Sequence, residues 1–281
     1  MRIVVKLAGA LLEDDATVRS LAAQIVELAS QHEVLVIHGG GRIFTATLAK
    51  MGVESKFLAG LRITDQQTRD AAVMVFAGLL GKRLSAAISA AGRPAVGICA
   101  ADALCFQAEP MTLDGASAAL GYVGYITGVN AGFLESLWRE GIVPVAASLG
   151  AGPDGELFNV NADHMAAACA EFLGAQRLVY LTDVPGVLHG ETVMSQVHLD
   201  DVEEMIRTHR VTGGMVLKLE ACRRAMEGGV AEICIVGGTA PGMLLAAADG
   251  AGGGTRICDG GAEVPVRPEP MAVRFATGGV A

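Results

Sequence analysis

Short apolar runs that end in glycine alternate along this chain with longer segments in which apolar residues recur at helical spacing. The clearest run, residues 34–37, has four apolar residues, three of them β-branched, and is followed by His38 and three glycines. This pattern is typical of a strand buried on both faces, and the amphipathic segment at 42–51 predicts a helix directly after it. The glycines either bring backbone N–H groups close to an anionic ligand at the helix start or simply allow a tight turn.

The same alternation predicts the remaining elements. Expected strands cover 3–7, 95–98, 142–147, 178–181 and 233–236, and expected helices cover 15–31, 64–91, 130–140, 164–173, 200–208, 215–227 and 241–249. Residues 57–63 and 101–127 are expected to be extended or hairpin-like, and Thr64 to Gln67 match a capping box. Alternating strands and helices predict an α/β fold with three layers (helix, sheet, helix) and a mostly parallel central sheet.

A soft boundary near residue 174 predicts two lobes, residues 1–174 and residues 175–260. Each lobe has its own glycine-rich turns between a strand and a helix. The tail at 261–281 holds three prolines and few periodic residues, so it is expected to be loosely ordered.

Composition and charge narrow the class of protein. The chain has 281 residues, 52% of them hydrophobic, and its net charge of −9 argues against a nucleic-acid partner. Lys6 interrupts the first apolar run, and no uninterrupted apolar run reaches the length of a membrane span. Six cysteines without CxxC spacing are expected to be free thiols in a reducing compartment. We therefore expect a cytoplasmic protein with no membrane partner.

The lysines carry more information than the net charge does. The chain has only five lysines against sixteen arginines, and two of the five occupy unusual places: Lys6 lies within an apolar strand and Lys218 follows a glycine pair. An ammonium group on a buried element needs an anionic partner. In a parallel sheet, the glycine-rich turns that follow the strands all lie along one edge, and Lys6 would lie at that edge too.

Several familiar sites are absent from the sequence. It contains no GxxxxGK[ST], no GxGxxG after the first strand, no GxSxG and no HxxxH, which argues against a P-loop NTPase, a nicotinamide enzyme, a serine hydrolase and a histidine metal site. Lys6, Lys218 and Asp163, together with Arg62 and the glycine N–H groups, instead suit phosphoryl transfer, which depends on positioning and electrostatic stabilisation. Asp163 would hold the two lysines together, although it also suits the start of a helix for electrostatic reasons alone.

Six segments, in order along the chain, resemble the amino acid kinase family, and within it the branch that phosphorylates N-acetylglutamate in arginine biosynthesis. They are Lys6-Leu7-Ala8-Gly9, His38-Gly39-Gly40-Gly41, Gly60-Leu61-Arg62-Ile63-Thr64, Asn159-Val160-Asn161-Ala162-Asp163, Asp183-Val184-Pro185-Gly186-Val187, and Gly213-Gly214-Met215 with Lys218. The resemblance covers the chain from residue 3 to about residue 258. It implies the amino acid kinase fold, an acceptor-binding and dimerising N-terminal lobe, and an ATP-binding C-terminal lobe.

The resemblance also implies a reaction and a set of roles. An ATP-dependent kinase would phosphorylate the side-chain carboxylate of N-acetyl-L-glutamate to give N-acetyl-L-glutamyl 5-phosphate, with Mg²⁺ held mainly by the nucleotide phosphates and no protein metal site. Lys6, Lys218 and Asp163 would be catalytic, and Gly40, Gly41, Arg62 and Asn159 would bind the substrate. The residues implied in ATP binding are Gly9, Asp183, Val184, Gly186, Val187, Leu188, Arg210, Val211, Thr212 and Gly214.

Further expectations follow from comparison with the family pattern. Ala8 replaces the usual first glycine, and its methyl group would crowd the phosphates unless its φ is negative. The first strand begins almost at Met1, and Thr255-Arg256-Ile257 resembles the ending of arginine-insensitive members. A homodimer without arginine regulation is therefore expected, with small molecules as its other partners.

Two alternatives remain. A kinase that acts on glutamate or aminoadipate linked to a carrier protein would share the fold, although the Asn-Val-Asn-Ala-Asp run argues against it. A non-catalytic arginine-sensing domain would also share the fold, although it has no need of both lysines.

Overall fold

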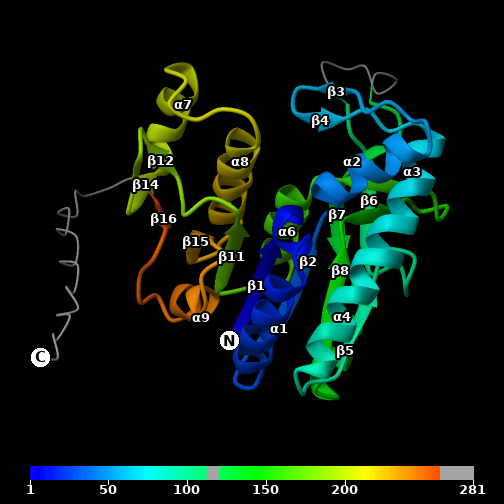
Figure 1. The fold of residues 1–281 in the computed structure, drawn as a ribbon, viewed down its shortest axis with the longest axis horizontal. Helices are drawn as coiled ribbons and strands as arrows, with labels where there is room; N and C mark the ends of the chain where they lie inside the picture. The colour runs from blue at the N-terminus through cyan, green and yellow to red at the C-terminus, as the bar shows by residue number, and fades with distance from the viewer. Residues whose placement is uncertain (113–119, 260–281) are drawn as a thin grey trace, which may run out of the picture.

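The computed structural model describes residues 1–112 and 120–259, so the tail expected to be loosely ordered lies outside the described residues. Its centre is an eight-stranded sheet in the order β14-β16-β15-β11-β1-β2-β8-β5 (Figure 1). These strands are β1 (Arg2–Leu7), β2 (Glu33–His38), β5 (Ala95–Ile98), β8 (Val143–Ala147), β11 (Arg177–Thr182), β14 (Gln196–His198), β15 (Glu232–Gly237) and β16 (Thr255–Cys258).

Helices cover both faces of the sheet, as the three-layer prediction requires. The helices are α1 (Asp15–Ala29), α2 (Gly41–Lys50), α3 (Gln66–Ala72), α4 (Gly81–Ala90), α5 (Ala131–Arg139), α6 (Ala162–Phe172), α7 (Leu199–Arg207), α8 (Gly214–Glu227) and α9 (Met243–Ala248), with a 3₁₀ turn at Gly9–Leu12. Successive residues of β1 alternate between two cores: Val4 packs with the α6 and α8 side, and Ile3 and Val5 pack with the α1 and α9 side. The predicted fold class is confirmed.

Strand direction determines where a ligand can bind. From β15 through β11, β1, β2 and β8 to β5, every neighbouring pair is parallel. The glycine turns that follow Leu7, His38, Ala147, Thr182 and Gly237 therefore lie at one edge of the sheet, as predicted. Strand β16, which the sequence pattern did not indicate, runs antiparallel to β15.

The helix expected over 64–91 runs from Gln66 to Ala90 and differs from the prediction in two details. Asp65, not Thr64, is its N-cap, because the Asp65 carboxylate accepts a hydrogen bond from the Thr68 N–H. Its middle, Val73–Leu80, is π-helical. By length and composition alone this helix could cross a membrane, which is weak evidence for a span, and half of its most apolar window is buried in the fold.

Small sheets complete the fold beside the main one. Strands β6 (Phe106–Pro110), β7 (Val123–Val129), β9 (Leu149–Ala151) and β10 (Leu157–Val160) close a small barrel. A hairpin formed by β3 (Phe57–Leu58) and β4 (Leu61–Arg62) projects above α2, and β12 (Leu188–His189) pairs with β13 (Thr192–Val193). The barrel contains the extended segments expected within 101–127, of which residues 113–119 lie outside the described part.

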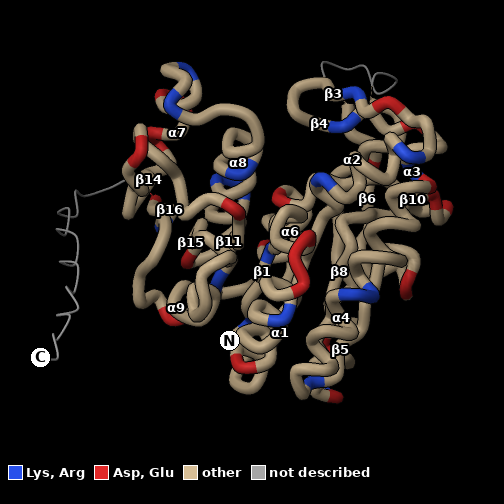
Figure 2. Tube along the Cα trace, viewed as in Figure 1, with Lys and Arg blue, Asp and Glu red and all other residues tan. Residues whose placement is uncertain are grey.

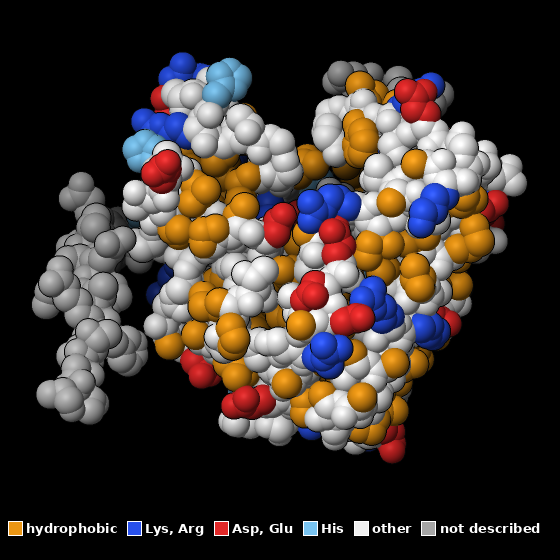
Figure 3. All heavy atoms as spheres, in the orientation of Figure 1, with side chains coloured by type: hydrophobic (Ala, Val, Ile, Leu, Met, Phe, Trp, Pro, Cys, Tyr) orange, Lys and Arg blue, Asp and Glu red, His pale blue; other side chains and the backbone are white. Residues whose placement is uncertain are grey.

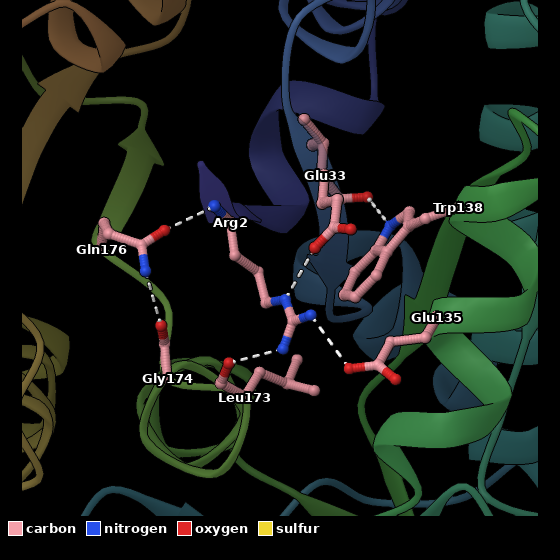
Figure 4. A network of polar contacts seen from close by, with 8 residues as sticks. Arg2, Glu33, Glu135, Trp138, Leu173, Gly174 and Gln176 are labelled. Atoms are coloured by element: carbon pink, nitrogen blue, oxygen red, sulfur yellow. Dashed lines mark hydrogen bonds and ion pairs between the residues drawn. The ribbon is translucent and has the colours of Figure 1, made fainter.

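Arg2 joins several elements at the opposite edge of the sheet, far from the glycine turns (Figure 4). Its guanidinium donates hydrogen bonds to Glu33 at 2.9 Å, to Glu135 at 3.0 Å and to the carbonyl of Leu173 at 2.8 Å. The group also lies 5.0 Å from the centroid of the Trp138 ring. These contacts connect β1 and β2 to α5 and to the end of α6, and so stabilise the edge away from the cavity described next.

Candidate active site

A cavity of about 250 Å³ opens at the edge of the sheet where the glycine turns meet. In the space-filling view, a notch lies above this edge, between the α7–α8 side and the β3–β4 hairpin (Figure 3). The residues that line the cavity are Lys6, Gly9, Gly39, Gly40, Gly41, Phe44, Phe57, Gly60, Leu61, Arg62, Phe76, Val123, Ser148, Asn159, Val160, Asn161, Ala162 and Asp163.

Two lysines share one carboxylate oxygen at this cavity. The ammonium nitrogen of Lys6 lies 2.6 Å from Asp163 Oδ1, and that of Lys218 lies 2.8 Å from the same oxygen. Lys6 reaches it from the end of β1, Asp163 from the first turn of α6, and Lys218 from α8. All three residues are buried. The fold thus brings together three residues that are far apart in the sequence, and the cluster carries one more positive charge than negative.

Burial and charge act against each other in this cluster. Burial lowers the pKa of the Lys6 ammonium to about 8, against the attraction of Asp163. Burial also raises the pKa of Asp163, but the two ammonium groups outweigh it and hold that pKa well below its usual range. Asp163 is therefore ionised at neutral pH. A buried cluster with excess positive charge favours an anionic ligand such as a transferring phosphoryl group.

Tyr180 supports the cluster from β11. Its hydroxyl donates a hydrogen bond of 3.0 Å to the backbone carbonyl of Asp163, and the Lys218 nitrogen lies 4.8 Å from the centroid of its ring. Tyr180 is fully buried. It therefore fixes the start of α6 and offers a π face to the ammonium at the same time.

The glycine turn after β2 packs directly on the turn after β1. A Cβ on Gly9 would lie 2.6 Å from the backbone of Gly41, and Gly41 itself has a φ of +49°. Both positions therefore require glycine, one for close approach and one for conformation. Ala8 has a φ of −67°, so its methyl group causes no backbone strain.

Arg62 and Asn159 are linked through Thr64. The Asn159 side-chain amide donates to Thr64 Oγ1 at 3.1 Å, and that hydroxyl donates to the Arg62 carbonyl at 2.8 Å. Thr64 is fully buried. The two candidate substrate residues are thus held in one network on the side of the cavity formed by the β4 strand and the barrel.

The residues expected to bind ATP lie elsewhere, with the exception of Gly9. Asp183, Val184, Gly186 and Val187 lie between β11 and β12, and Leu188 begins β12. Arg210, Val211 and Thr212 lie between α7 and α8, and Gly214 begins α8. Val187 and Val211 are buried, and the Val187 N–H donates to Thr255 Oγ1 at 2.8 Å. Arg210, Thr212 and Asp183 are exposed. The cavity is therefore lined by Lys6, Asp163 and the substrate candidates, with Lys218 joined to it through Asp163, whereas this second group lies outside it.

The sequence reading missed several residues that shape the cavity. Ser148 is buried beside Gly39. The Asn161 side chain caps α6 by accepting from the N–H groups of Asp163 and His164. The position of Asn161 two residues before Asp163, at the start of an apolar helix, was a signal that could have identified the cap. Phe44 and Phe57 gave no such signal, because aromatic residues at these positions look like core residues.

A profile of the amino acid kinase family matches residues 1–237. The chain belongs to this family. Acetylglutamate kinase from Koribacter versatilis is 46% identical over 243 residues, which cover 85% of this chain and 91% of that protein. Acetylglutamate kinase from Methanopyrus kandleri is 44% identical over 238 residues, which cover 83% and 93%.

A solved structure extends this comparison. N-acetylglutamate synthase from Neisseria gonorrhoeae, complexed with coenzyme A and N-acetyl-glutamate, superposes with a TM-score of 0.80 at 26% identity. The match covers 92% of this chain and 60% of that one. This shared architecture agrees with the sheet order and layers described above.

Proposed function

We propose that this protein transfers the γ-phosphoryl group of ATP to the side-chain carboxylate of N-acetyl-L-glutamate, forming N-acetyl-L-glutamyl 5-phosphate in arginine biosynthesis. The buried Lys6–Asp163–Lys218 cluster beside the glycine turn carries this proposal. Its excess positive charge suits the negative charge spread over a phosphoryl group in transfer. The names of the relatives that are 44–46% identical supply the acceptor.

The residues divide into three roles. Lys6 and Lys218 stabilise the transferring group, and Asp163 keeps their ammonium groups together. Gly40 and Gly41 offer backbone N–H groups at the start of α2, and Arg62 with Asn159 binds the acceptor, the guanidinium facing its α-carboxylate. The acceptor's own side-chain carboxylate is ionised at neutral pH and attacks directly, so the step needs no general base.

The same division of roles indicates which groups would hold the nucleotide and the metal ion. Gly9 and the residues at 183–188 and 210–214 would hold ATP. Among the described residues no group of three His, Cys, Asp or Glu side chains could hold a metal ion, and Asp163 already has two ammonium partners. Mg²⁺ would therefore be held mainly by the nucleotide phosphates, where it neutralises their charge.

The proposal also covers the organisation of the chain. All residues that line the cavity precede residue 164, which supports an acceptor-binding lobe at 1–174 and a nucleotide-binding lobe at 175–260 on one continuous sheet.

The Gln66–Ala90 helix exposes Met74 and Leu79, each more than half accessible, and we assign this face to a homodimer interface. Lys, Arg, Asp and Glu are interspersed along the visible trace (Figure 2), which suits small-molecule partners better than nucleic acid.

An acceptor panel tests the reaction. With ATP and Mg²⁺, hydroxylamine trapping of the acyl phosphate should give product with N-acetylglutamate and not with glutamate, aspartate, aminoadipate or carbamate. Equal product with one of these acceptors would overturn the acceptor assignment. No product with any acceptor, alongside binding of arginine, would favour a non-catalytic sensing domain.

A lysine substitution tests the role of the cluster. Lys218→Ala should lower kcat by at least ~100-fold, the scale of losing one group that stabilises the transition state. The matched control is Lys50→Ala, because Lys50 is exposed at the end of α2. Turnover near the wild-type rate in Lys218→Ala would contradict the role assigned to the cluster.

A further inference from the structure

Arg62 lies between two aromatic rings. Its guanidinium carbon is 4.8 Å from the centroid of Phe44 and 4.6 Å from that of Phe57. Phe57 is the direct cross-strand partner of Arg62 in the β3–β4 hairpin, and Phe44 comes from α2. A guanidinium held between two ring faces keeps its plane fixed and presents its N–H edge outward.

The aromatic stack continues to the glycine turn. Phe44 meets Phe76 edge to face, with ring centroids 4.7 Å apart. A Cβ on Gly40 would lie 2.0 Å from Phe76 Cε1 and 2.6 Å from Phe44 Cβ. The same stack therefore packs against the glycine turn at one end and holds Arg62 at the other.

The hydrogen bonds of Arg62 leave part of its edge free. Its Nη2 donates to Thr45 Oγ1 at 2.8 Å, while its Nη1 is buried and has no partner within residues 1–112 and 120–259. In the same part of the chain Arg62 forms no ion pair with an acidic side chain, unlike Lys6 and Lys218. A cation that lines the cavity in this way suits an incoming carboxylate.

We propose that Phe44 and Phe57 are positioning residues that hold Arg62 edge-on to the carboxylate of the acidic acceptor. The proposal rests on the function proposed above and adds residues that set acceptor affinity without touching the phosphoryl group. The two rings shield the faces of the guanidinium from water and restrict its rotation. Less ordering is therefore needed when the acceptor binds.

Phe57 is the residue to test, because it is 57% exposed and its replacement leaves the core intact, whereas Phe44 is only 2% exposed. In the full chain, Phe57→Leu should raise both the KM and the calorimetric Kd for N-acetylglutamate about fivefold, the scale of one lost cation–π contact. The KM for ATP and kcat should change less than twofold. Phe57→Tyr keeps the ring and should restore wild-type affinity. Leu58→Ala, on the same hairpin, is the matched control.

A double-mutant cycle shows whether Phe57 acts through Arg62. In an Arg62→Gln background, Phe57→Leu should change the Kd for N-acetylglutamate less than twofold. A fivefold loss in both backgrounds would mean that Phe57 contacts the acceptor directly, and no loss in the wild-type background would remove its role; either result overturns the proposal.

A measurement without acceptor separates this proposal from the proposed function. The ¹⁵N order parameter of the Arg62 Nε–H group should fall in Phe57→Leu and remain at the wild-type value in Phe57→Tyr. An unchanged order parameter in Phe57→Leu would contradict the restraint. If the wild-type protein fails to bind N-acetylglutamate while the order parameter falls, the acceptor assignment fails and the restraint of Arg62 stands.

Discussion

The charge state of Lys6 depends on pH within the range in which enzymes are assayed. Burial lowers its pKa to about 8, and Asp163 opposes that effect. The ammonium charge is therefore present below pH 8 and is lost as the pH rises through that value. Because the three groups interact strongly, the observed titration belongs to the cluster as a whole.

We expect kcat/KM for ATP to fall as the pH rises through about 8. Asp163→Asn removes the attraction that keeps Lys6 protonated, so this decline should begin roughly one pH unit lower or more. Lys6→Arg carries a group that stays protonated at every assay pH and should lose the decline, even if its rate is lower. Profiles of kcat/KM between pH 6 and 10 for the three proteins provide the measurement. If kcat/KM declines identically in Lys6→Arg, the decline comes from the titration of a group other than Lys6.

The sequence identified the charged residues of the site but not the residues that support them. Lys6 and Lys218 were recognisable because an ammonium in an apolar or glycine-rich context needs a partner, and Asp163 because an acid can hold two like charges together. Tyr180 and Phe57 were not recognisable. An aromatic residue in a strand reads as part of the core, and its contact with a cation depends on packing between segments distant in the sequence.

At the scale of elements, the β3–β4 hairpin contains a strained turn. Its two turn residues, Ala59 and Gly60, have φ values of +49° and +78°. Such a turn favours Asn-Gly or Gly-Gly, because an alanine in the left-handed region costs about 1–2 kcal/mol. The strain lies in the same hairpin that carries Phe57 and Arg62.

Ala59→Asn should raise the free energy of unfolding by about 1 kcal/mol, because asparagine tolerates this conformation better than alanine does. Urea unfolding and thermal melting provide the measurement. Ala46→Asn is the matched control: Ala46 is exposed within α2, where asparagine should slightly destabilise the helix. A loss of stability in Ala59→Asn equal to that of the control would contradict the strain.

Periodicity predicted the existence of most elements better than their details. The helix over Gln66–Ala90 was expected, but its π-helical middle, Val73–Leu80, was not, since a wider turn leaves little trace in an already apolar sequence. The short strand Thr255–Cys258 was missed because four residues after a glycine run give too little pattern. Its place in the sheet comes from pairing with β15, which no local signal reveals.

At the scale of the whole molecule, strand direction made the position of the site predictable. Alternating strands and helices implied parallel strands, and parallel strands place their glycine turns at one edge. The resemblance implied that the nucleotide residues belong to a separate lobe, but their distance from the cavity was less predictable. It depends on how α7 and α8 pack beside the sheet, and the sequence pattern does not specify that packing.

The exposed apolar face of the Gln66–Ala90 helix leads to a prediction about assembly. Met74 is 56% exposed and Leu79 is 55% exposed, and burial of the exposed half of each side chain contributes roughly 0.8–1.5 kcal/mol. A homodimer that buries this face twice through two-fold symmetry would bring like residues of the two copies together. We therefore expect the wild-type protein to have the mass of a dimer in light scattering coupled to size-exclusion chromatography.

Met74→Glu combined with Leu79→Glu should convert this dimer to a monomer, because the substitutions place four carboxylates in the apolar contact. The matched control is Phe172→Glu, which introduces the same charge at a side chain that is 42% exposed at the end of α6. The control should keep the dimer mass. A monomeric wild type would contradict the homodimer. A double variant that remains dimeric would show that the interface lies on another face.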